Sequence, residues 1–207
     1  MEKDNRENVF EVYNKVADWF AENRDKGLME KNYLDEVITH LSDDSSILDL
    51  GCGTGIPILS YFLSRKLNIT GLDASSKILS IAKKNFPSTP FIQADMRELS
   101  LNKKFDAIIA WHSFFHLPAE DQPAMFAKFE KHLNPGGILL FTSGTVHGEA
   151  WGQIGGENLF HGSLNTEEYL KLLTDHHFTL LKHQTDDPHC GNATVWMAKY
   201  TPVFKTV

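Results

Sequence analysis

The sequence predicts an α/β fold in which a mostly parallel sheet carries helices on both faces. Two observations carry this prediction. Short apolar runs of strand length alternate with longer amphipathic runs along most of the 207-residue chain. A glycine-rich turn at residues 51–55 joins the first short run to the next amphipathic one. Strands that alternate with helices form crossover units, and these units place their strands parallel.

The individual elements follow from the period of the apolar residues. Apolar side chains at helical spacing over 9–20 and 33–41 predict two amphipathic helices ahead of the sheet. Further amphipathic runs predict helices at 56–67, 76–85, 120–133 and 166–174. Runs too short for a buried helix predict strands at 47–50, 69–73, 91–95, 105–111, 138–143, 179–184 and 194–200.

The end of the chain departs from this alternation. Residues 186–192 form a polar loop without a helical pattern, so the strands on either side of it are expected to pair antiparallel. Residues 144–165 are rich in glycine and are expected to form a long stretch with little regular order. A loop of that length in a compact domain is usually functional or mobile, so a lid over a pocket and a surface excursion are both open.

The length fits one domain that needs no disulfide or structural metal. Its expected parts are N-terminal helices (1–45), a core that carries the glycine-rich turn (46–143), the Gly-rich loop or lid (144–165), and a C-terminal helix and hairpin (166–207). The oligomeric state has no signature in the sequence.

The charge balance excludes some partners. The chain has 20 Lys and Arg against 27 Asp and Glu, a net charge of −7, which argues against broad binding to nucleic acid or to an anionic membrane. We expect no transmembrane or signal segment, because no stretch approaches the roughly 20 apolar residues that span a bilayer. Cys52 and Cys190 are expected to be reduced thiols, and the expected location is the cytoplasm.

The turn at 49–55 has the pattern D-x-G-x-G-x-G, which lets a ligand approach the backbone closely. A dinucleotide site would need a third glycine where Ile56 stands, and a phosphate loop would need a Lys and a Ser or Thr after the glycines. Asp73 ends the second strand and can accept hydrogen bonds from both hydroxyls of a ribose. Ribose recognition without a phosphate site predicts a nucleoside ligand.

Two residues at the end of the third strand extend this site. Asp95 can accept a hydrogen bond from an exocyclic amine, and Met96 can lie against a purine ring. Together with Asp49 and Asp73, Asp95 would place three carboxylates at successive strand ends. That arrangement favours a ligand with positive charge.

These segments resemble the motifs of the class I S-adenosylmethionine-dependent methyltransferases. Residues 48–55 (LDLGCGTG) resemble the first motif, 71–73 (GLD) the second, 93–96 (QADM) the adenine-binding segment, and 133–137 (LNPGG) the turn before the fifth strand. The resemblance extends over about residues 9–200. It implies a Rossmann-like, seven-stranded sheet of order 3-2-1-4-5-7-6 with the last strand antiparallel. It also implies S-adenosylmethionine as cofactor and methyl transfer as the activity.

The resemblance further implies which residues meet the cofactor. The first turn would lie near the methionine part, Asp73 at the ribose, and Asp95 with Met96 at the adenine. A tyrosine on the first helices often closes over the cofactor in related enzymes. Trp111, at the end of the fourth strand, would contact the cofactor or serve as a core aromatic. The expected set is Tyr13, Asp49, Gly51, Cys52, Gly53, Asp73, Ala74, Asp95, Met96 and Trp111.

Methyl transfer from a sulfonium depends mainly on alignment and exclusion of water. Where a base is needed, the candidates are His112, His116 and, in the Gly-rich stretch, His147. His112 and His116 share a face if their segment is one helical turn. A general base, a structural histidine and a zinc pair are the alternatives, although a zinc site would need a further ligand and none is expected.

The acceptor is expected to be a small molecule. The sequence lacks the Asn/Asp-Pro-Pro-Tyr/Phe motif that amino-group methylases of nucleobases and glutamine share after the fourth strand, and its charge disfavours nucleic acid. The alternatives are methylation of a protein or RNA group, a non-catalytic module that binds S-adenosylmethionine or S-adenosylhomocysteine, and a nucleotide-dependent oxidoreductase.

Overall fold

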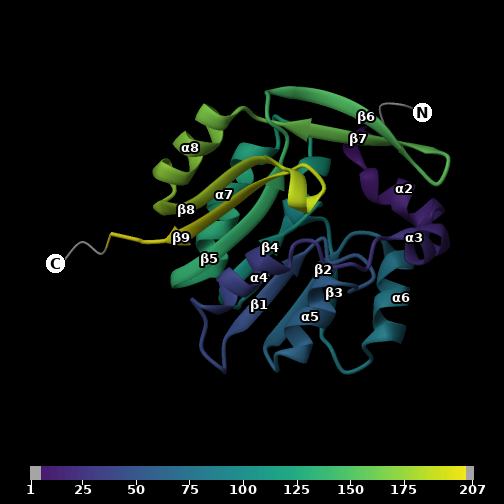
Figure 1. Ribbon diagram of the computed structural model, residues 1–207, viewed down its shortest axis with the longest axis horizontal. Helices are drawn as coiled ribbons and strands as arrows, with labels where there is room; N and C mark the ends of the chain where they lie inside the picture. The colour runs from purple at the N-terminus through teal and green to yellow at the C-terminus, as the bar shows by residue number, and fades with distance from the viewer. Residues whose placement is uncertain (1–5, 204–207) are drawn as a thin grey trace.

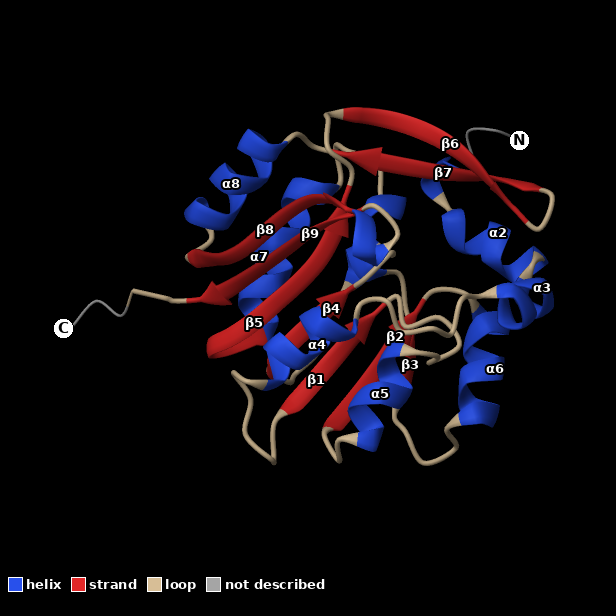
Figure 2. Cartoon of the chain, in the orientation of Figure 1, coloured by secondary structure: helices blue, strands red, loops and turns tan. Residues whose placement is uncertain are grey.

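A computed structural model describes residues 6–203 of the chain, shown in Figures 1 and 2. Residues 1–5 and 204–207, the outer ends of the predicted parts 1–45 and 166–207, lie outside the described residues. The α-helices are α2 (Val9–Lys15), α3 (Ala17–Asn23), α4 (Lys31–Ile38), α5 (Ile58–Ser64), α6 (Ser76–Asn85), α7 (Gln122–His132) and α8 (Thr166–Asp175). Within residues 6–203, no helix has the length and apolar content to cross a membrane.

The strands form one seven-stranded sheet and one two-stranded sheet. They are β1 (Ser46–Leu50), β2 (Asn68–Asp73), β3 (Phe91–Gln93), β4 (Phe105–Ala110), β5 (Leu133–Ser143), β6 (Gly148–Ile154), β7 (Glu157–Ser163), β8 (Phe178–Asp187) and β9 (Ala193–Tyr200). Within residues 6–203, three short 3-10 turns lie between these helices and strands, η1 (Met96–Glu98), η2 (Phe114–His116) and η3 (Pro188–Cys190).

The large sheet has the order β3-β2-β1-β4-β5-β9-β8. Strands β1 to β5 pair in parallel, whereas β9 is antiparallel to both β5 and β8. Because β6 and β7 lie in the other sheet, β8 and β9 are the sixth and seventh strands here, and the predicted order 3-2-1-4-5-7-6 is confirmed. The carboxyl ends of the parallel strands share one edge, so the turns after β1, β2 and β4 meet there.

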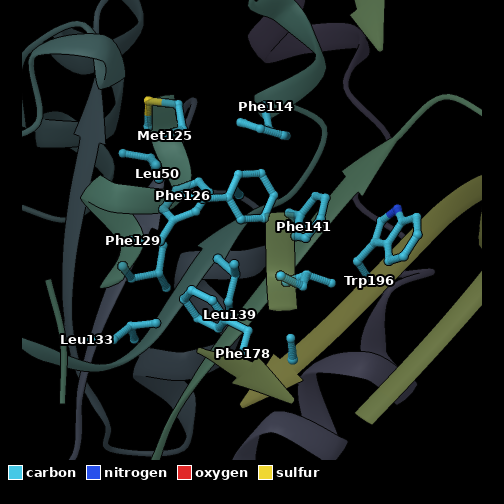
Figure 3. Packing of buried hydrophobic residues seen from close by; sticks show 14 of the residues in the cluster. Leu50, Phe114, Met125, Phe126, Phe129, Leu133, Leu139, Phe141, Phe178 and Trp196 are labelled. Atoms are coloured by element: carbon cyan, nitrogen blue, oxygen red, sulfur yellow. The ribbon is translucent and has the colours of Figure 1, made fainter. Parts of the chain in front are cut away.

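The core has two layers, one on each face of the large sheet. In β4, Ala107 and Ile109 join the cluster beneath α4, α5 and α6, whereas Ile108 and Ala110 join the cluster beneath α7 and α8. This alternation is the period of two that a strand imposes on its side chains. Figure 3 shows the second cluster, whose aromatic members include Phe114, Phe126, Phe129, Phe141, Phe178 and Trp196.

The expectation of little regular order at 144–165 is wrong. β6 and β7 pair antiparallel, with Ile154 opposite Glu157. The two residues between them, Gly155 and Gly156, have φ of 55° and 86°, as the commonest two-residue hairpin turn requires. Glycines at other positions interrupt the apolar alternation of these strands, but a Gly-Gly pair between two strand-length runs is itself a hairpin signal.

The N-terminal helix expected at 9–20 is divided at Val16, whose φ of −103° and ψ of 16° separate α2 from α3. α2 packs against both α6 and β7, so the hairpin lies beside the N-terminal helices (Figure 1). Val9, Val12 and Phe160 are buried members of the small core between them. This contact joins segments more than 140 positions apart in the sequence, and it positions the cover of the site described below.

The polar loop predicted at 186–192 contains one helical feature that the sequence pattern did not indicate. The 3-10 turn η3 is capped by Asp187, whose Oδ1 accepts from the backbone N–H of His189 at 2.9 Å. β8 and β9 nevertheless pair antiparallel across it, as predicted. Cys190 of this turn and Cys52 are both buried free thiols.

Candidate functional site

A cavity of about 300 Å³ lies at the carboxyl edge of the large sheet. The turns after β1 and β2 and the segments after β3 and β4 line its floor. Residues of α2, α3, η2 and the β6–β7 hairpin line its cover. In open α/β sheets, ligands bind in this crevice, at the point where the strand order reverses.

The glycine-rich turn brings three strand ends together. Gly51 has a φ of 80°, and its N–H donates to the Leu72 carbonyl at 2.7 Å. A Cβ on Gly51 would lie 2.2 Å from the Cβ of Ser113, so only glycine fits against the segment after β4. Gly53 has a φ of 56°, and its N–H donates to Oδ2 of Asp73 at 3.0 Å. The turn thereby fixes the end of β1 against both of its neighbours.

Asp73 is held rigidly at the end of β2. Its Oδ1 accepts from the Ser75 N–H at 2.9 Å, and its Oδ2 accepts from Gly53. Burial raises the pKa of Asp73, while these backbone hydrogen bonds act in the opposite direction. Each carboxylate oxygen retains a further lone pair, so Asp73 can still accept two hydrogen bonds from a ligand.

Asp49 lies across the turn from Asp73 and differs from it in its hydrogen bonding. Its side chain is buried, yet no hydrogen bond within residues 6–203 reaches its carboxylate. Burial and the charge of Asp73 raise the pKa of Asp49 to about 7. A cation placed in the cavity would stabilise its ionised form.

Arg24, the residue directly after α3, is a cationic residue of the cavity that the sequence did not predict. It lines the cavity with its guanidinium 5.8 Å from the centre of the Phe20 ring. No carboxylate of the described residues lies within ion-pair distance of it. Nothing in its local sequence marks it, because only the packing of α3 over the sheet edge brings it to the cavity.

Asp95 lines the cavity but is not a free carboxylate. Arg97 donates to its Oδ2 from Nη2 at 2.7 Å and from Nε at 3.1 Å. The Asp95 side chain also caps η1 by accepting from the Arg97 backbone N–H. The three carboxylates expected at successive strand ends all line the cavity, but Asp95 is paired with Arg97, which follows it closely enough to fold back onto it.

The remaining residues expected at the cofactor, Tyr13, Cys52, Ala74, Met96 and Trp111, all line the same cavity. Burial raises the pKa of the Cys52 thiol well above its usual value, so the thiol is neutral and unsuited to nucleophilic chemistry. The Trp111 Nε1–H is buried and has no hydrogen-bond partner among the described residues. A buried donor without a partner is unusual in a folded protein and often marks a place for a water or a ligand.

A continuous series of rings, which we call the aromatic wall, covers the side of the cavity nearest the hairpin. The Phe115 ring centre lies 5.1 Å from that of His161 and 4.9 Å from that of His116. His116 and His161 are themselves 5.1 Å apart. The aromatic wall consists of Tyr13, Phe20, Trp111, His112, Phe115, His116 and His161.

His116 uses both of its ring nitrogens within the protein. The Phe160 carbonyl can only accept, so Nδ1 of His116 carries the proton and donates to it at 2.9 Å. Nε2 then accepts from the Tyr13 hydroxyl, also at 2.9 Å. Burial lowers the pKa of His116 to about 3, which keeps the ring neutral. This geometry ties α2 to β7 and leaves no lone pair for a metal or for a reacting proton.

His112 and His161 differ from His116 in this respect. No hydrogen bond among residues 6–203 uses a ring nitrogen of either one. His112 has a φ of 50°, and its backbone N–H donates to Thr142 Oγ1 at 2.8 Å. Burial, with the charge of Arg24 next, lowers the pKa of His112 to about 4, and burial also lowers the pKa of His161. Sequence reasoning did not propose His161 as a base, because β7 was not recognised as a strand.

His147 is not brought to the cavity. Its side chain is 54% exposed, and Nδ1 lies 2.9 Å from Oε2 of Glu168 on α8. It stands just before β6, at the far end of the hairpin from the Gly155-Gly156 turn. The expectation that His147 joins His112 and His116 is therefore corrected. In the part of the chain that the structure describes, no three potential ligands converge to hold a metal ion.

Comparison with known proteins shows what the chain is similar to. A family model described as a methyltransferase domain matches residues 47–137. A dTDP-3-amino-3,4,6-trideoxy-alpha-D-glucopyranose N,N-dimethyltransferase of Streptomyces venezuelae is 31% identical over 124 residues, which are 59% of this chain and 52% of that protein. A ubiquinone/menaquinone biosynthesis C-methyltransferase of Campylobacter jejuni is 30% identical over 148 residues, 65% of this chain and 63% of that protein. The chain thus spans roughly half to two thirds of these relatives.

Solved structures share the fold. The 1,6-didemethyltoxoflavin-N1-methyltransferase of Burkholderia thailandensis, with its substrate and S-adenosylhomocysteine bound, superposes with a TM-score of 0.72 at 20% identity and covers 94% of this chain and 88% of that one. An S-adenosylmethionine-bound amino pentose methyltransferase of Micromonospora echinaspora has a TM-score of 0.71 at 18% identity, covering 89% and 95%. The predicted resemblance to the class I S-adenosylmethionine-dependent methyltransferases is confirmed, since residues 47–137 match a methyltransferase-domain model and the solved structures share the fold.

Proposed function

We propose that this chain is an S-adenosylmethionine-dependent methyltransferase that acts on a small molecule. The observation that carries the proposal is the pair of carboxylates on either side of one glycine turn. Asp73 is fixed by backbone amides at the end of β2, and Asp49 is buried with no partner among the described residues. A nucleoside with a cationic tail would satisfy both groups, whereas a pyrophosphate would be repelled by both.

The residues of the cavity fit this cofactor in three places. Asp73 would accept the ribose hydroxyls, and Asp49 would pair with the methionine ammonium. Arg24 is available for the methionine carboxylate. Ala74 and Met96 would contact the adenine, with Asp95 beside it. The backbone of Gly51, Cys52 and Gly53 offers a surface without large side chains, and Tyr13 and Trp111 complete the cover.

When bound, S-adenosylmethionine would supply a methyl group on a sulfonium, and a nucleophile would attack the methyl carbon in line with the leaving sulfur. The work of this chain is then to bind, orient and exclude water. α2 and the hairpin cover the cavity, and the hydrogen bonds of His116 to Tyr13 and to the Phe160 carbonyl hold these two parts together. Burial raises the pKa of Tyr13, so its hydroxyl keeps the proton that it donates to His116.

The acceptor class rests on the relatives and on the charge of the chain. Relatives named for amino-sugar and quinone-pathway methylation act on small molecules, and we extend that class to this chain. The net charge of −7 disfavours RNA. The only two cysteines are unpaired, which suits a reducing compartment, so we place the activity in the cytoplasm.

Incubation with methyl-tritiated S-adenosylmethionine and a fractionated cell extract tests the proposal. We expect label to move into a low-mass fraction. Label in protein or RNA would contradict the small-molecule class. Binding of S-adenosylhomocysteine without any methyl transfer would indicate a non-catalytic binding module instead.

A further inference from the structure

The aromatic wall leaves few polar atoms free to meet a methyl acceptor. Both ring nitrogens of His116 are used within the protein, and so is the hydroxyl hydrogen of Tyr13. The rings of His112 and His161 are only partly buried, and no hydrogen bond of the described residues engages their nitrogens. A molecule lying on the wall therefore meets apolar ring surface with imidazole nitrogens at two positions.

These two histidines come from distant parts of the chain. His112 lies just after β4, and His161 stands on β7 of the hairpin. Phe115 links them, with ring centres 5.8 Å from His112 and 5.1 Å from His161. On the neighbouring strand β6, a Cβ on Gly152 would lie 3.3 Å from Cε1 of His161, so the glycine gives the imidazole the room it occupies.

We propose, building on the proposed function, that His161 and His112 bind the reacting group of the acceptor and that His161 removes its proton. The acceptor is an uncharged compound with a flat apolar body and a nucleophilic O–H or N–H, such as a phenol, an aromatic amine or a heteroaromatic N–H. The flat body would lie on the aromatic wall, where rings stack favourably on rings.

The charges around the wall favour an uncharged acceptor over a protonated amine. The titratable groups nearest His161 are His116, in ring contact with it, and His112, whose pKa it influences; Tyr13 from α2 lies beyond His116, and all three are neutral at pH 7. Arg24 is the cation whose charge acts on His112, whereas Arg97, which also lines the cavity, is paired with Asp95 and Asp121. The carboxylates Asp49 and Asp73 lie at the glycine turn, where the cofactor would occupy them.

The chemistry balances with one proton acceptor. The lone pair of the acceptor forms a bond to the methyl carbon, the carbon–sulfur bond breaks with its electron pair on sulfur, and the acceptor proton moves to the free imidazole nitrogen of His161. His161 suits this role better than His112. The positive charge of Arg24 acts on His112 and disfavours its protonated form, and the pKa of His112 is lowered to about 4.

The test compares His161→Gln with wild type and with His147→Gln, a matched change at an exposed histidine outside the cavity. Each protein is titrated with S-adenosylhomocysteine and then assayed with labelled S-adenosylmethionine and three probes: a catechol, an aromatic amine and an aliphatic amino sugar. We expect equal affinity for S-adenosylhomocysteine in all three proteins, and transfer by wild type to an aromatic probe. His161→Gln should lower kcat by about 100- to 10,000-fold, whereas His147→Gln should not change it.

A second measurement does not depend on turnover. In ¹³C-histidine-labelled protein saturated with S-adenosylhomocysteine, the aromatic probe should shift the imidazole signal that His161→Gln removes and leave the His147 signal unchanged. Wild-type kcat in His161→Gln, an unshifted His161 signal, or transfer to the amino sugar alone would each overturn this inference while leaving the methyltransferase proposal intact. Failure of the wild-type chain to bind S-adenosylhomocysteine would instead contradict the proposed function itself.

Discussion

The two sides of the cavity are built in different ways. The side formed by β1 and β2 comes from two short motifs, in which Asp49, Gly51 and Asp73 lie at the ends of neighbouring strands. The aromatic wall comes from α2, α3, the segment after β4 and a hairpin, four pieces that meet only in the folded chain. Under the proposed function, the strand-end side would bind the nucleoside part of the cofactor, and the separately built aromatic wall would select the acceptor. Substitutions on the two sides should therefore separate cofactor binding from the choice of acceptor.

The largest expected effect is on the attachment of the hairpin. Phe160 is fully buried between β7 and α2, and Phe160→Ala should lower the free energy of unfolding by about 3–5 kcal/mol. Trp151→Ala is the matched control, because Trp151 contacts Phe160 from the other strand but is 46% exposed. Urea denaturation measures both. An equal, small loss in the two variants would show that the hairpin is not docked through Phe160.

The next effect concerns the ribose position. Asp73→Ala should weaken S-adenosylhomocysteine binding by about 1.5–3 kcal/mol, roughly 10- to 150-fold, because two charge-assisted hydrogen bonds are lost. Calorimetry measures the change, with Asp175→Ala on the exposed end of α8 as control. An unchanged dissociation constant in Asp73→Ala would remove Asp73 from the site.

The pH dependence of binding examines Asp49 separately. Its pKa of about 7 in the ligand-free protein means that below pH 7 the carboxyl holds a proton, which a cationic ligand must displace. The dissociation constant of S-adenosylhomocysteine should therefore rise about tenfold as the pH falls from 8 to 6. His112 and His116 stay neutral in this range, because their pKa values are about 4 and 3. Asp49→Asn should bind more weakly and without this slope, and a flat wild-type profile would contradict the role of Asp49.

The smallest effect is expected at His147. His147→Gln removes one exposed contact to Glu168, so the free energy of unfolding should change by less than about 0.5 kcal/mol. Binding of S-adenosylhomocysteine should be unchanged, as titration of the two proteins would show. A tenfold loss of affinity for S-adenosylhomocysteine would contradict the placement of His147 outside the cavity.

The sequence predicted the strand-end side of the site because each of its residues belongs to a local pattern. Asp49 and Gly51 share one turn, and the parallel sheet necessarily brings Asp73 beside them. The neutralisation of Asp95 was not predicted, because the pattern does not say which way the Arg97 side chain turns.

The cover was predicted less well for a physical reason. Arg24 and His161 reach the cavity through the packing of α3 and of the hairpin, and no short pattern encodes those contacts. The hairpin itself had a usable signal in Gly155-Gly156, since both residues need a positive φ in a two-residue turn. A hairpin turn at that position predicts that His161 lies on the second strand and that His147 lies at the end of the hairpin away from the turn.

The most direct test of the central claim is a calorimetric titration of the wild-type chain with S-adenosylhomocysteine and, separately, with NADH. Two carboxylates at the glycine turn, with no lysine among the described residues that line the cavity, predict that S-adenosylhomocysteine binds with one-to-one stoichiometry and that NADH does not bind. Binding of NADH with no response to S-adenosylhomocysteine would contradict the account.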